Sequence, residues 1–315
     1  MAGPLLLTRQ PAAPYVPLRV RSCYSFLDAT LTPAAVVALA QRYECPAVAL
    51  VDLGNLHGAV AFTEAAQQAG IQPILGVELQ VEGAPLILYV ESARGYANLC
   101  QLLSEDGPEF ATASTAAPPC PDPGKDDPFT DALSAGHTVA ARQRRNRTRK
   151  ELEGFTEGLI AVAADPRWAD LFPGRFYLAA AGSARTTIPD GKPRLLCPPV
   201  HYATPEEQEL HLILQAIRTR TLLRQPHPEK HFGRRWHFRS PAEMELLGRG
   251  HAHWRALGRE IAERCRFVLP GDGPSFPRMP LRTAAHRAPF CGDWWKRDCN
   301  GDTVGAVPAP RTAGT

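Results

Sequence analysis

The chain has 315 residues, of which 44% are hydrophobic and 21% charged, and its formal net charge is +3. This length suffices for one large or two modest domains with a buried core, and so small a net charge does not identify a nucleic-acid-binding protein. The sequence has no run of about 18 apolar residues and no basic region at its N-terminus, so we expect a cytoplasmic protein without a membrane span or secretory signal. The eight cysteines have no paired spacing, which excludes a disulfide scaffold and a CxxC zinc site.

The first patterned region, residues 15–104, alternates short apolar strands with amphipathic helices. Strands are predicted at residues 18–20, 47–51, 73–79 and 85–90. Helices are predicted from Thr32-Pro33 to about residue 42, at 59–69 with Gly70 as the end signal, and at 95–103. This order favours a mainly parallel sheet or barrel with functional groups at the C-terminal ends of the strands.

The next segment, residues 105–150, interrupts this pattern. It is rich in Pro, Ala, Asp and Ser and ends in the basic run ARQRRNRTRK. We predict a flexible, disordered insertion, because such a composition buries little apolar surface. The basic run could contact phosphates, although a solvated charge cluster is the favoured interpretation.

Regular patterns return after this insertion. Strands are predicted at residues 158–163, 175–179 and 194–197, and a helix at about 253–266. Two further helices should begin at Thr204 and Ser240, because each is followed three residues later by a glutamate, Glu207 and Glu243, as in a capping box. Residues 282–315 show neither a helical nor a strand period, and we predict an irregular, disordered tail.

Seven segments of the sequence occur in an order seen in one known family: LRVRSCYSFLDATLTP, AVALVDLGNLHGAVAF, GIQPILGVEL, ARGYANLCQLLS, LEGFTEGLIAVA, PPVHYATPEEQELHLILQAIRT and IAERCRF. Together they resemble the N-terminal PHP (polymerase and histidinol phosphatase) domain of the bacterial DNA polymerase III alpha subunit. The resemblance divides the chain into an N-terminal extension (1–14), a first part of the PHP domain (15–104), the insertion (105–150), a second part with the start of the link to a polymerase core (151–281), and the tail (282–315).

This resemblance implies an α/β fold, a distorted (β/α)7 TIM-like barrel with a metal centre at the C-terminal ends of its strands. Active members of the family hydrolyse phosphoester bonds there with Zn, Mn or Mg and can serve as a proofreading exonuclease. Templated nucleotide addition in the parent enzyme belongs to a separate domain, where carboxylates hold two Mg ions. The partners implied are DNA and other polymerase III holoenzyme subunits, with no membrane.

The family's metal positions are only partly kept in this sequence. The first 56 residues contain no histidine, and arginine cannot ligate a metal. The retained or chemically permissible positions are Asp28, Asp52, Glu78, Asp165 and His201. The replaced positions are Arg19, Arg21, Leu53, Pro85 and Pro199. We therefore expect no cofactor and no catalytic residue in this chain, and predict that Arg19 and Arg21 form ion pairs with Asp28 and Glu78 in place of metal contacts.

Several of these residues also have a plain structural interpretation. Asp52 is favoured as a cap of the Gly-rich turn that follows it, His201 as a hydrogen-bonded structural histidine, and His57 as a surface histidine. Glu78 is equally well explained as an ordinary strand-end carboxylate. Basic residues interleaved with aromatics further along suit a nucleic-acid surface or a solvated loop, and both remain open; they are Arg218, Arg220, Arg234, Arg235 and Trp236.

The sequence contains no Asp-x-Asp pair of the kind that two-metal nucleotidyl transfer uses in this family. The favoured hypothesis is therefore a PHP-domain fragment of a polymerase III alpha-type replicase, truncated or frame-shifted, with a degenerate metal site and a structural role in DNA replication. The alternatives are a stand-alone PHP metal-dependent phosphoesterase or 3′–5′ exonuclease, and a degraded reading frame.

Overall fold

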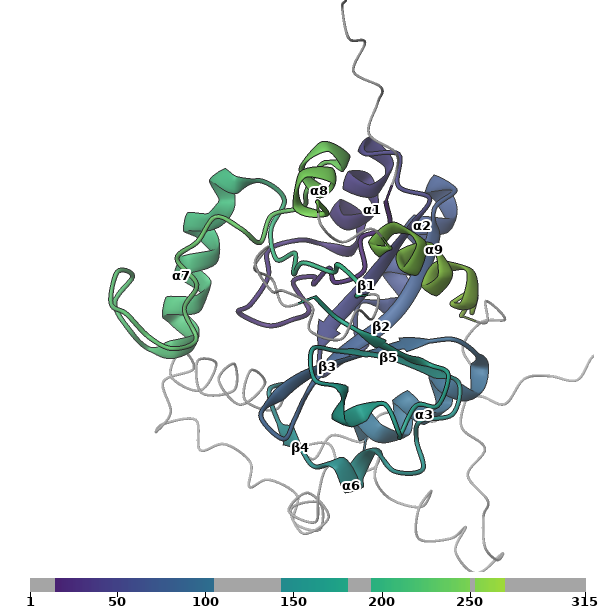
Figure 1. Ribbon diagram of the computed structural model, residues 1–315. Coiled ribbons are helices and arrows are strands. Elements are labelled where there is room, and N and C mark those ends of the chain that lie inside the picture. Colours follow the sequence, from purple (N-terminus) through teal and green to yellow (C-terminus); the bar gives the residue numbers. More distant parts are fainter. Residues whose placement is uncertain (1–14, 105–142, 181–193, 250–252, 270–315) are drawn as a thin grey trace, which may run out of the picture. The chain divides into compact units, whose positions relative to one another are not determined.

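The computed structural model describes residues 15–104, 143–180, 194–249 and 253–269 (Figure 1). The predicted N-terminal extension, most of the predicted insertion and the predicted tail lie outside these residues. The strands are β1 (Ala47–Leu53), β2 (Gln72–Val81), β3 (Ala84–Val90), β4 (Asn146–Arg147), β5 (Leu159–Ala163) and β6 (Phe176–Leu178). The helices are α1 (Pro33–Arg42), α2 (Ala59–Ala69), α3 (Ala93–Ser104), α6 (Arg149–Leu152), α7 (Gln208–Thr219), α8 (Pro241–Leu247) and α9 (Trp254–Arg264), with 3₁₀ turns η1 (Pro166–Trp168) and η2 (Pro205–Glu207).

The strands form one mixed sheet in the order β1-β2-β3-β5-β6, and β4 pairs with β2. The pairs β1–β2, β2–β4 and β5–β6 are parallel, whereas β2–β3 and β3–β5 are antiparallel. The prediction of an α/β fold is confirmed, but the sheet is less parallel than predicted. The cause is local: Glu82 and Gly83 connect β2 to β3 with φ of 48° and 78°, the backbone of a tight hairpin turn, which imposes antiparallel pairing.

Single β-bridges extend the sheet beyond its outer strands. Val20 pairs with Leu50 of β1 and with Val200, and Ala179 pairs with Leu195. Within the described residues, the predicted strands at 18–20 and 194–197 therefore exist as isolated bridges. A closed seven-stranded barrel stays a prediction.

Two hydrophobic clusters fill the two faces of the sheet, because alternate residues of each strand point to opposite sides. On β1, Val48 and Leu50 belong to one cluster and Ala49 and Val51 to the other. The first cluster is completed by α1, α2 and α3, and the second includes Ile261 of α9. All seven residues of β1 are buried, so its C-terminal end is held rigidly at the edge where the polar residues gather. Among the described residues, no helix is both long and apolar enough to cross a bilayer.

The helix end signals are confirmed at three of the four predicted positions. Thr32 accepts a hydrogen bond from the Ala35 amide, and Gly70 closes α2 with φ of 67°. Ser240 and Glu243 form a complete capping box on α8. The prediction for Thr204 is wrong: its side chain accepts no capping hydrogen bond, because a 3₁₀ turn intervenes before α7.

The difference between these two signals gives a prediction. We expect Ser240→Ala to lower the free energy of unfolding by about 1 kcal/mol, because the amide of Glu243 loses its acceptor at the start of α8. Thr204→Ala is the matched control and should change this free energy by less than about 0.5 kcal/mol. Urea unfolding followed by circular dichroism measures both, and equal losses in the two variants would contradict the assignment.

The last residues of the predicted insertion, 143–150, differ from the prediction of disorder. The Gln143 side chain donates to the Tyr24 carbonyl (2.8 Å) and accepts from the Phe26 amide (2.9 Å). Gly54 permits this approach, since it has φ of 61° and a Cβ there would lie 2.4 Å from the Gln143 carbonyl oxygen. Part of the basic run is thereby fixed against the C-terminal end of β1.

Candidate functional site

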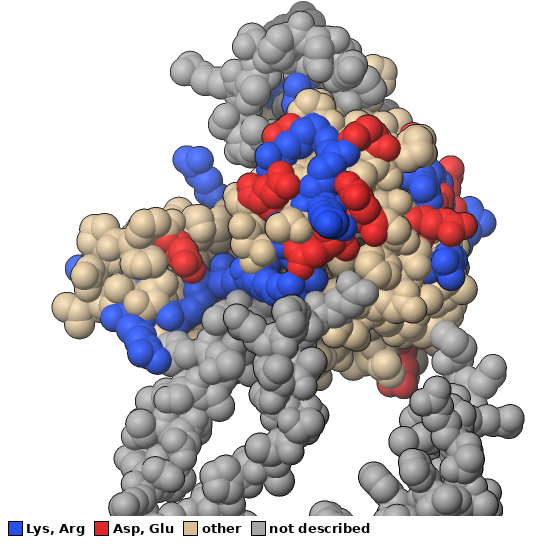
Figure 2. All heavy atoms as spheres, turned by 90° about the horizontal axis from the view of Figure 1, so that it is seen from below, with Lys and Arg blue, Asp and Glu red and all other residues tan. Residues whose placement is uncertain are grey.

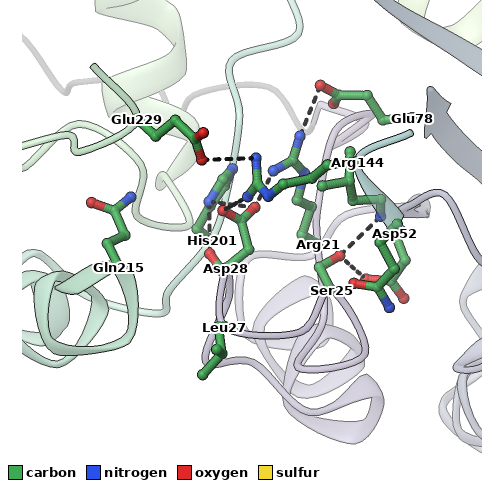
Figure 3. A network of polar contacts seen from close by, with 12 residues as sticks. Arg21, Ser25, Leu27, Asp28, Asp52, Glu78, Arg144, His201, Gln215 and Glu229 are labelled. Carbon is green, nitrogen blue, oxygen red and sulfur yellow. Dashed lines mark hydrogen bonds and ion pairs between the residues drawn. The ribbon is translucent and has the colours of Figure 1, made fainter. Parts of the chain in front are cut away.

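The centre of the candidate site is Arg21, whose guanidinium lies between two buried carboxylates (Figure 3). It donates to Asp28 and lies 2.8 Å from Glu78. Arg19 binds Glu78 with two parallel hydrogen bonds of 2.7 Å each. The ion pairs predicted from the sequence are therefore confirmed, and the bidentate pair has the geometry in which an arginine–carboxylate interaction is strongest.

Asp28 also receives two arginines from distant parts of the chain. Its Oδ1 accepts from Arg144, at 2.5 Å, and from Arg218 at the end of α7. Glu229 lies further out, 3.4 Å from Arg218 and 3.9 Å from Arg144 (Figure 3). One buried carboxylate thus holds together the loop after Val20, the segment before β4, and α7.

The charges shift the pKa values of the two carboxyl groups in the same direction. Burial alone would raise both, but the surrounding guanidiniums outweigh it. Arg21, with Arg144 and Arg218, holds the pKa of Asp28 well below its ordinary value. Arg19 and Arg21 lower the pKa of Glu78 to about 2. Both groups are therefore ionised at neutral pH.

Two buried histidines lie on the backbone side of Asp28. Nδ1 of His201 and Nε2 of His211 each lie 3.0 Å from the Asp28 carbonyl oxygen. Burial and the nearby Arg21 hold the pKa of His201 well below its usual range, and burial lowers that of His211 to about 4. Trp236 packs on both rings, with centroid distances of 4.3 and 5.7 Å. His201 is therefore a hydrogen-bonded structural residue, as the favoured interpretation predicts.

Asp52 belongs to a separate network at the end of β1. It accepts hydrogen bonds from the Ser22 amide, the Ser22 hydroxyl and the Ser25 hydroxyl, each at 2.7 Å. Burial raises its pKa, and these hydrogen bonds partly oppose the rise. The interpretation of Asp52 as a cap of the following turn is wrong, because Asn55 performs that role by accepting from the His57 amide. Asp52 instead positions the Ser22–Ser25 loop.

The remaining sequence-predicted positions are spread around this centre. Leu53 ends β1 opposite Glu78, whereas Pro85 is an exposed residue at the start of β3. Pro199 is half-buried beside Val200. Asp165 caps η1 and lies 3.3 Å from Arg167, so the structure does not bring it to Asp28 or Glu78. His57 is exposed, as expected.

The predicted basic and aromatic cluster is divided by the structure. Arg218 points inward to Asp28 and Trp236 is half-buried against His201, while Arg220, Arg234 and Arg235 are exposed. Figure 2 shows Lys and Arg gathered in a band on one face, with a second group interleaved with Asp and Glu. Whether any of these residues contacts nucleic acid stays a prediction.

Sequence reasoning missed two members of the site, Arg144 and His211, and assigned Arg218 to a different role. Arg144 lies in the basic run ARQRRNRTRK, for which a solvated charge cluster is the favoured interpretation. His211 lies on α7, four residues from Gln215, whose side-chain amide contacts it at 3.3 Å. The sequence of α7 carries no signal for this placement, because polar residues that recur at helical spacing ordinarily form the solvent-facing side of a helix.

A metal ion does not fit this site. Asp28, His201 and His211 have possible ligand atoms within 4.8 Å of one another. However, both Asp28 oxygens accept from arginines, and a cation there would face three guanidiniums at close range. The histidine nitrogens that face the Asp28 carbonyl oxygen must also carry protons to bond with it, and a protonated ring nitrogen cannot ligate.

Two sequence comparisons match this chain to a PHP-domain model and to bacterial DNA polymerases. A sequence model described as "PHP domain" matches residues 17–168. An error-prone DNA polymerase of Symbiobacterium thermophilum is 33% identical over 310 residues, covering 88% of this chain and 27% of the relative. DNA polymerase III subunit alpha of Chlamydia trachomatis is 26% identical over 319 residues, covering 84% of this chain and 25% of the relative.

The same subunit of Caulobacter vibrioides is 26% identical over 315 residues, covering 87% of this chain and 25% of the relative. The chain thus spans about a quarter of the length of these relatives. A solved amidohydrolase structure from Chromobacterium violaceum is 18% identical, covers 47% of this chain and 66% of that chain, and aligns with a TM-score of 0.30, too low to inform fold or function.

Proposed function

Because the chain carries a PHP domain homologous to part of bacterial DNA polymerase III alpha subunits, we propose that it is a structural PHP module of the DNA replication machinery, without hydrolytic activity of its own. The observation that carries this proposal is the position of Arg21, which bridges Asp28 and Glu78 where a metal-dependent member would hold cations. The polymerase names belong to relatives about four times as long. These relatives are the basis on which we include DNA and other polymerase III subunits as partners, and the cytoplasm as the location, in this proposal.

The arginines give the site a stabilising role. Asp28 joins three segments that are far apart in sequence, and Glu78 ties β2 to the segment around Arg19. A metal ion cross-links a fold in a comparable way, since it binds ligands from several segments at once. Fixed cations on arginine side chains maintain such a cross-link without supplying an activated water.

A metal and activity assay tests this proposal. We expect the purified chain, dialysed against zinc or manganese and then against metal-free buffer, to retain a substoichiometric amount of metal by mass spectrometry. We also expect no EDTA-sensitive release of nucleotides from a 3′-labelled DNA strand. The physical reason is that three guanidiniums occupy the Asp28 carboxylate.

The second candidate, a metal-dependent phosphoesterase, is supported by the proximity of Asp28, His201 and His211 alone. Stoichiometric metal together with EDTA-sensitive cleavage would establish it and overturn the structural proposal. Asp28→Asn, with its fold verified by circular dichroism, is the control variant for this outcome. It removes the only carboxylate of the group, so metal that the folded variant binds as tightly as the unmodified chain is bound elsewhere.

A further inference from the structure

Helix α7 buries three polar residues and exposes three large apolar ones. Gln208, His211 and Gln215 are buried, with at most 9% of each residue exposed. Leu210, Ile213 and Ile217 are 49%, 41% and 45% exposed. A surface helix of a globular protein normally has the opposite arrangement.

Hydrogen bonds fix this orientation. The Gln208 amide donates to the Phe232 carbonyl (3.0 Å), and the Gln215 side-chain oxygen accepts from the His231 amide (2.9 Å). His211 lies between Gln208 and Gln215 on α7, and its Nε2 is 3.0 Å from the Asp28 carbonyl oxygen. Turning the apolar side of α7 inward would break all of these bonds and leave buried polar groups unsatisfied, which is costly. The exposed apolar residues are therefore a stable feature of the fold.

The exposed residues form a continuous seam, which we call the α7 surface. It comprises Leu210, Ile213, Ile217 and, after the helix, Leu222, which is 78% exposed. A groove of about 450 Å³ runs along its C-terminal half and is also lined by Arg220. Contiguous exposed apolar residues of this kind mark sites of protein association.

The ends of the α7 surface carry opposite charges. Glu206 stands four residues before Leu210, and Arg220 three residues after Ile217. Leu210, Ile213 and Ile217 follow one another at three and four residues, the spacing of a helix–helix seam. Glu206 lies in the 3₁₀ turn η2 just before α7, and Arg220 is the residue that ends α7, so the two charges lie at opposite ends of this seam. Within the described part of the chain, neither Glu206 nor Arg220 forms an ion pair. An identical helix running antiparallel meets this surface with apolar against apolar and acid against base.

We propose that the α7 surface is a homodimer interface in which two copies of this chain pair their α7 helices antiparallel about a two-fold axis near Ile213. Leu210 of each copy packs against Ile217 and the groove of the other, and Glu206 pairs with Arg220 at both ends. An isologous contact of this kind is self-complementary and closed. Because α7 is about 18 Å long, the contact buries less than the roughly 800 Å² per partner of a standard interface, and we expect a dissociation constant in the micromolar range.

Analytical ultracentrifugation over a concentration series tests the apolar part of the interface. We expect the intact chain to pass from monomer to dimer as its concentration rises, and Ile213→Glu to weaken the dimer at least about tenfold. Leu246→Glu is the matched control, since Leu246 on α8 is 60% exposed but lies outside the α7 surface. It should leave the equilibrium unchanged.

Charge reversal tests the antiparallel orientation. Glu206→Arg and Arg220→Glu alone should each weaken self-association, since each places like charges at both ends of the seam. An equimolar mixture of the two variants should dimerise at least as strongly as the unmodified chain, because both ends of the mixed pair then carry opposite charges. Circular dichroism of each variant verifies that its helix content is unchanged.

Two results would overturn the proposal. The first is a chain that stays monomeric at about 100 µM, which would leave a different protein as the occupant of the α7 surface. The second is a dimer that survives Ile213→Glu and does not respond to mixing the charge variants, which would place the interface elsewhere.

Discussion

Replacing Asp28 by asparagine is expected to lower the free energy of unfolding at pH 7 by about 3–5 kcal/mol, the largest effect of any single substitution considered. Asparagine has nearly the same shape, so no cavity forms. It removes the negative charge on which Arg21, Arg144 and Arg218 converge. The buried guanidiniums of Arg21 and Arg218 and the half-buried one of Arg144 are then left near one another. Glu78 opposes only Arg21, and the carboxylate that faces the other two, Glu229, is about half exposed to water and compensates them weakly.

Urea unfolding at pH 7 measures this loss, and an exposed ion pair supplies the control. Arg94 lies 3.4 Å from Glu157 with both side chains more than half exposed, so Glu157→Gln should cost less than about 1 kcal/mol. The measurements are repeated in EDTA. A wild-type protein that loses stability in EDTA would show that Asp28 acts through a bound metal, and a cost below about 1 kcal/mol for Asp28→Asn would show that the arginine cluster does not cross-link the fold.

The elements with local signals could be predicted from the sequence. Thr32-Pro33 and Gly70 mark helix ends, because capping and a left-handed end residue depend on the chain within a few positions. The antiparallel hairpin at Glu82-Gly83 was missed, although its two-residue turn is also local. The strand–helix order of the surrounding segments favours a mainly parallel sheet, and this turn between two consecutive strands departs from that order.

The candidate site could be predicted only in part, and from the family resemblance rather than from local signals. The resemblance shows that arginine replaces two metal-ligand positions. This replacement predicts the ion pairs among Arg19, Arg21, Asp28 and Glu78. Arg144 did not, because it lies 116 residues from Asp28 in sequence. Neither periodicity nor spacing in the sequence indicates a contact between residues so far apart in the chain. A basic run also has the same sequence whether its side chains are solvated or paired with a buried carboxylate.

Lowering the pH from 7 to about 4.5 is expected to destabilise the fold before Asp28 and Glu78, whose pKa values are lowered, begin to titrate. The pKa of His211 is about 4 in the folded state, against an unfolded value of about 6.5. At pH values between these two, the unfolded chain binds a proton at His211 that the folded chain does not bind. The contribution of His211 to the free energy of unfolding is therefore fully present above pH 6.5 and is lost as the pH falls toward 4. His211 contributes up to about 3 kcal/mol to this loss, and His201 acts in the same direction.

The variant His211→Gln isolates this contribution, because glutamine can still donate to the Asp28 carbonyl but does not titrate. We expect urea unfolding from pH 7 to 4.5 to show a steep loss of stability in the unmodified chain and a loss smaller by about 2 kcal/mol in the variant. Asp52, whose pKa is raised, contributes with the opposite sign in both proteins and cancels in the difference. Glu78 titrates lower, toward pH 2, so it does not affect this window. Identical pH dependence in the two proteins would mean that His211 has the same pKa in the fold as in the unfolded chain, and would contradict the prediction.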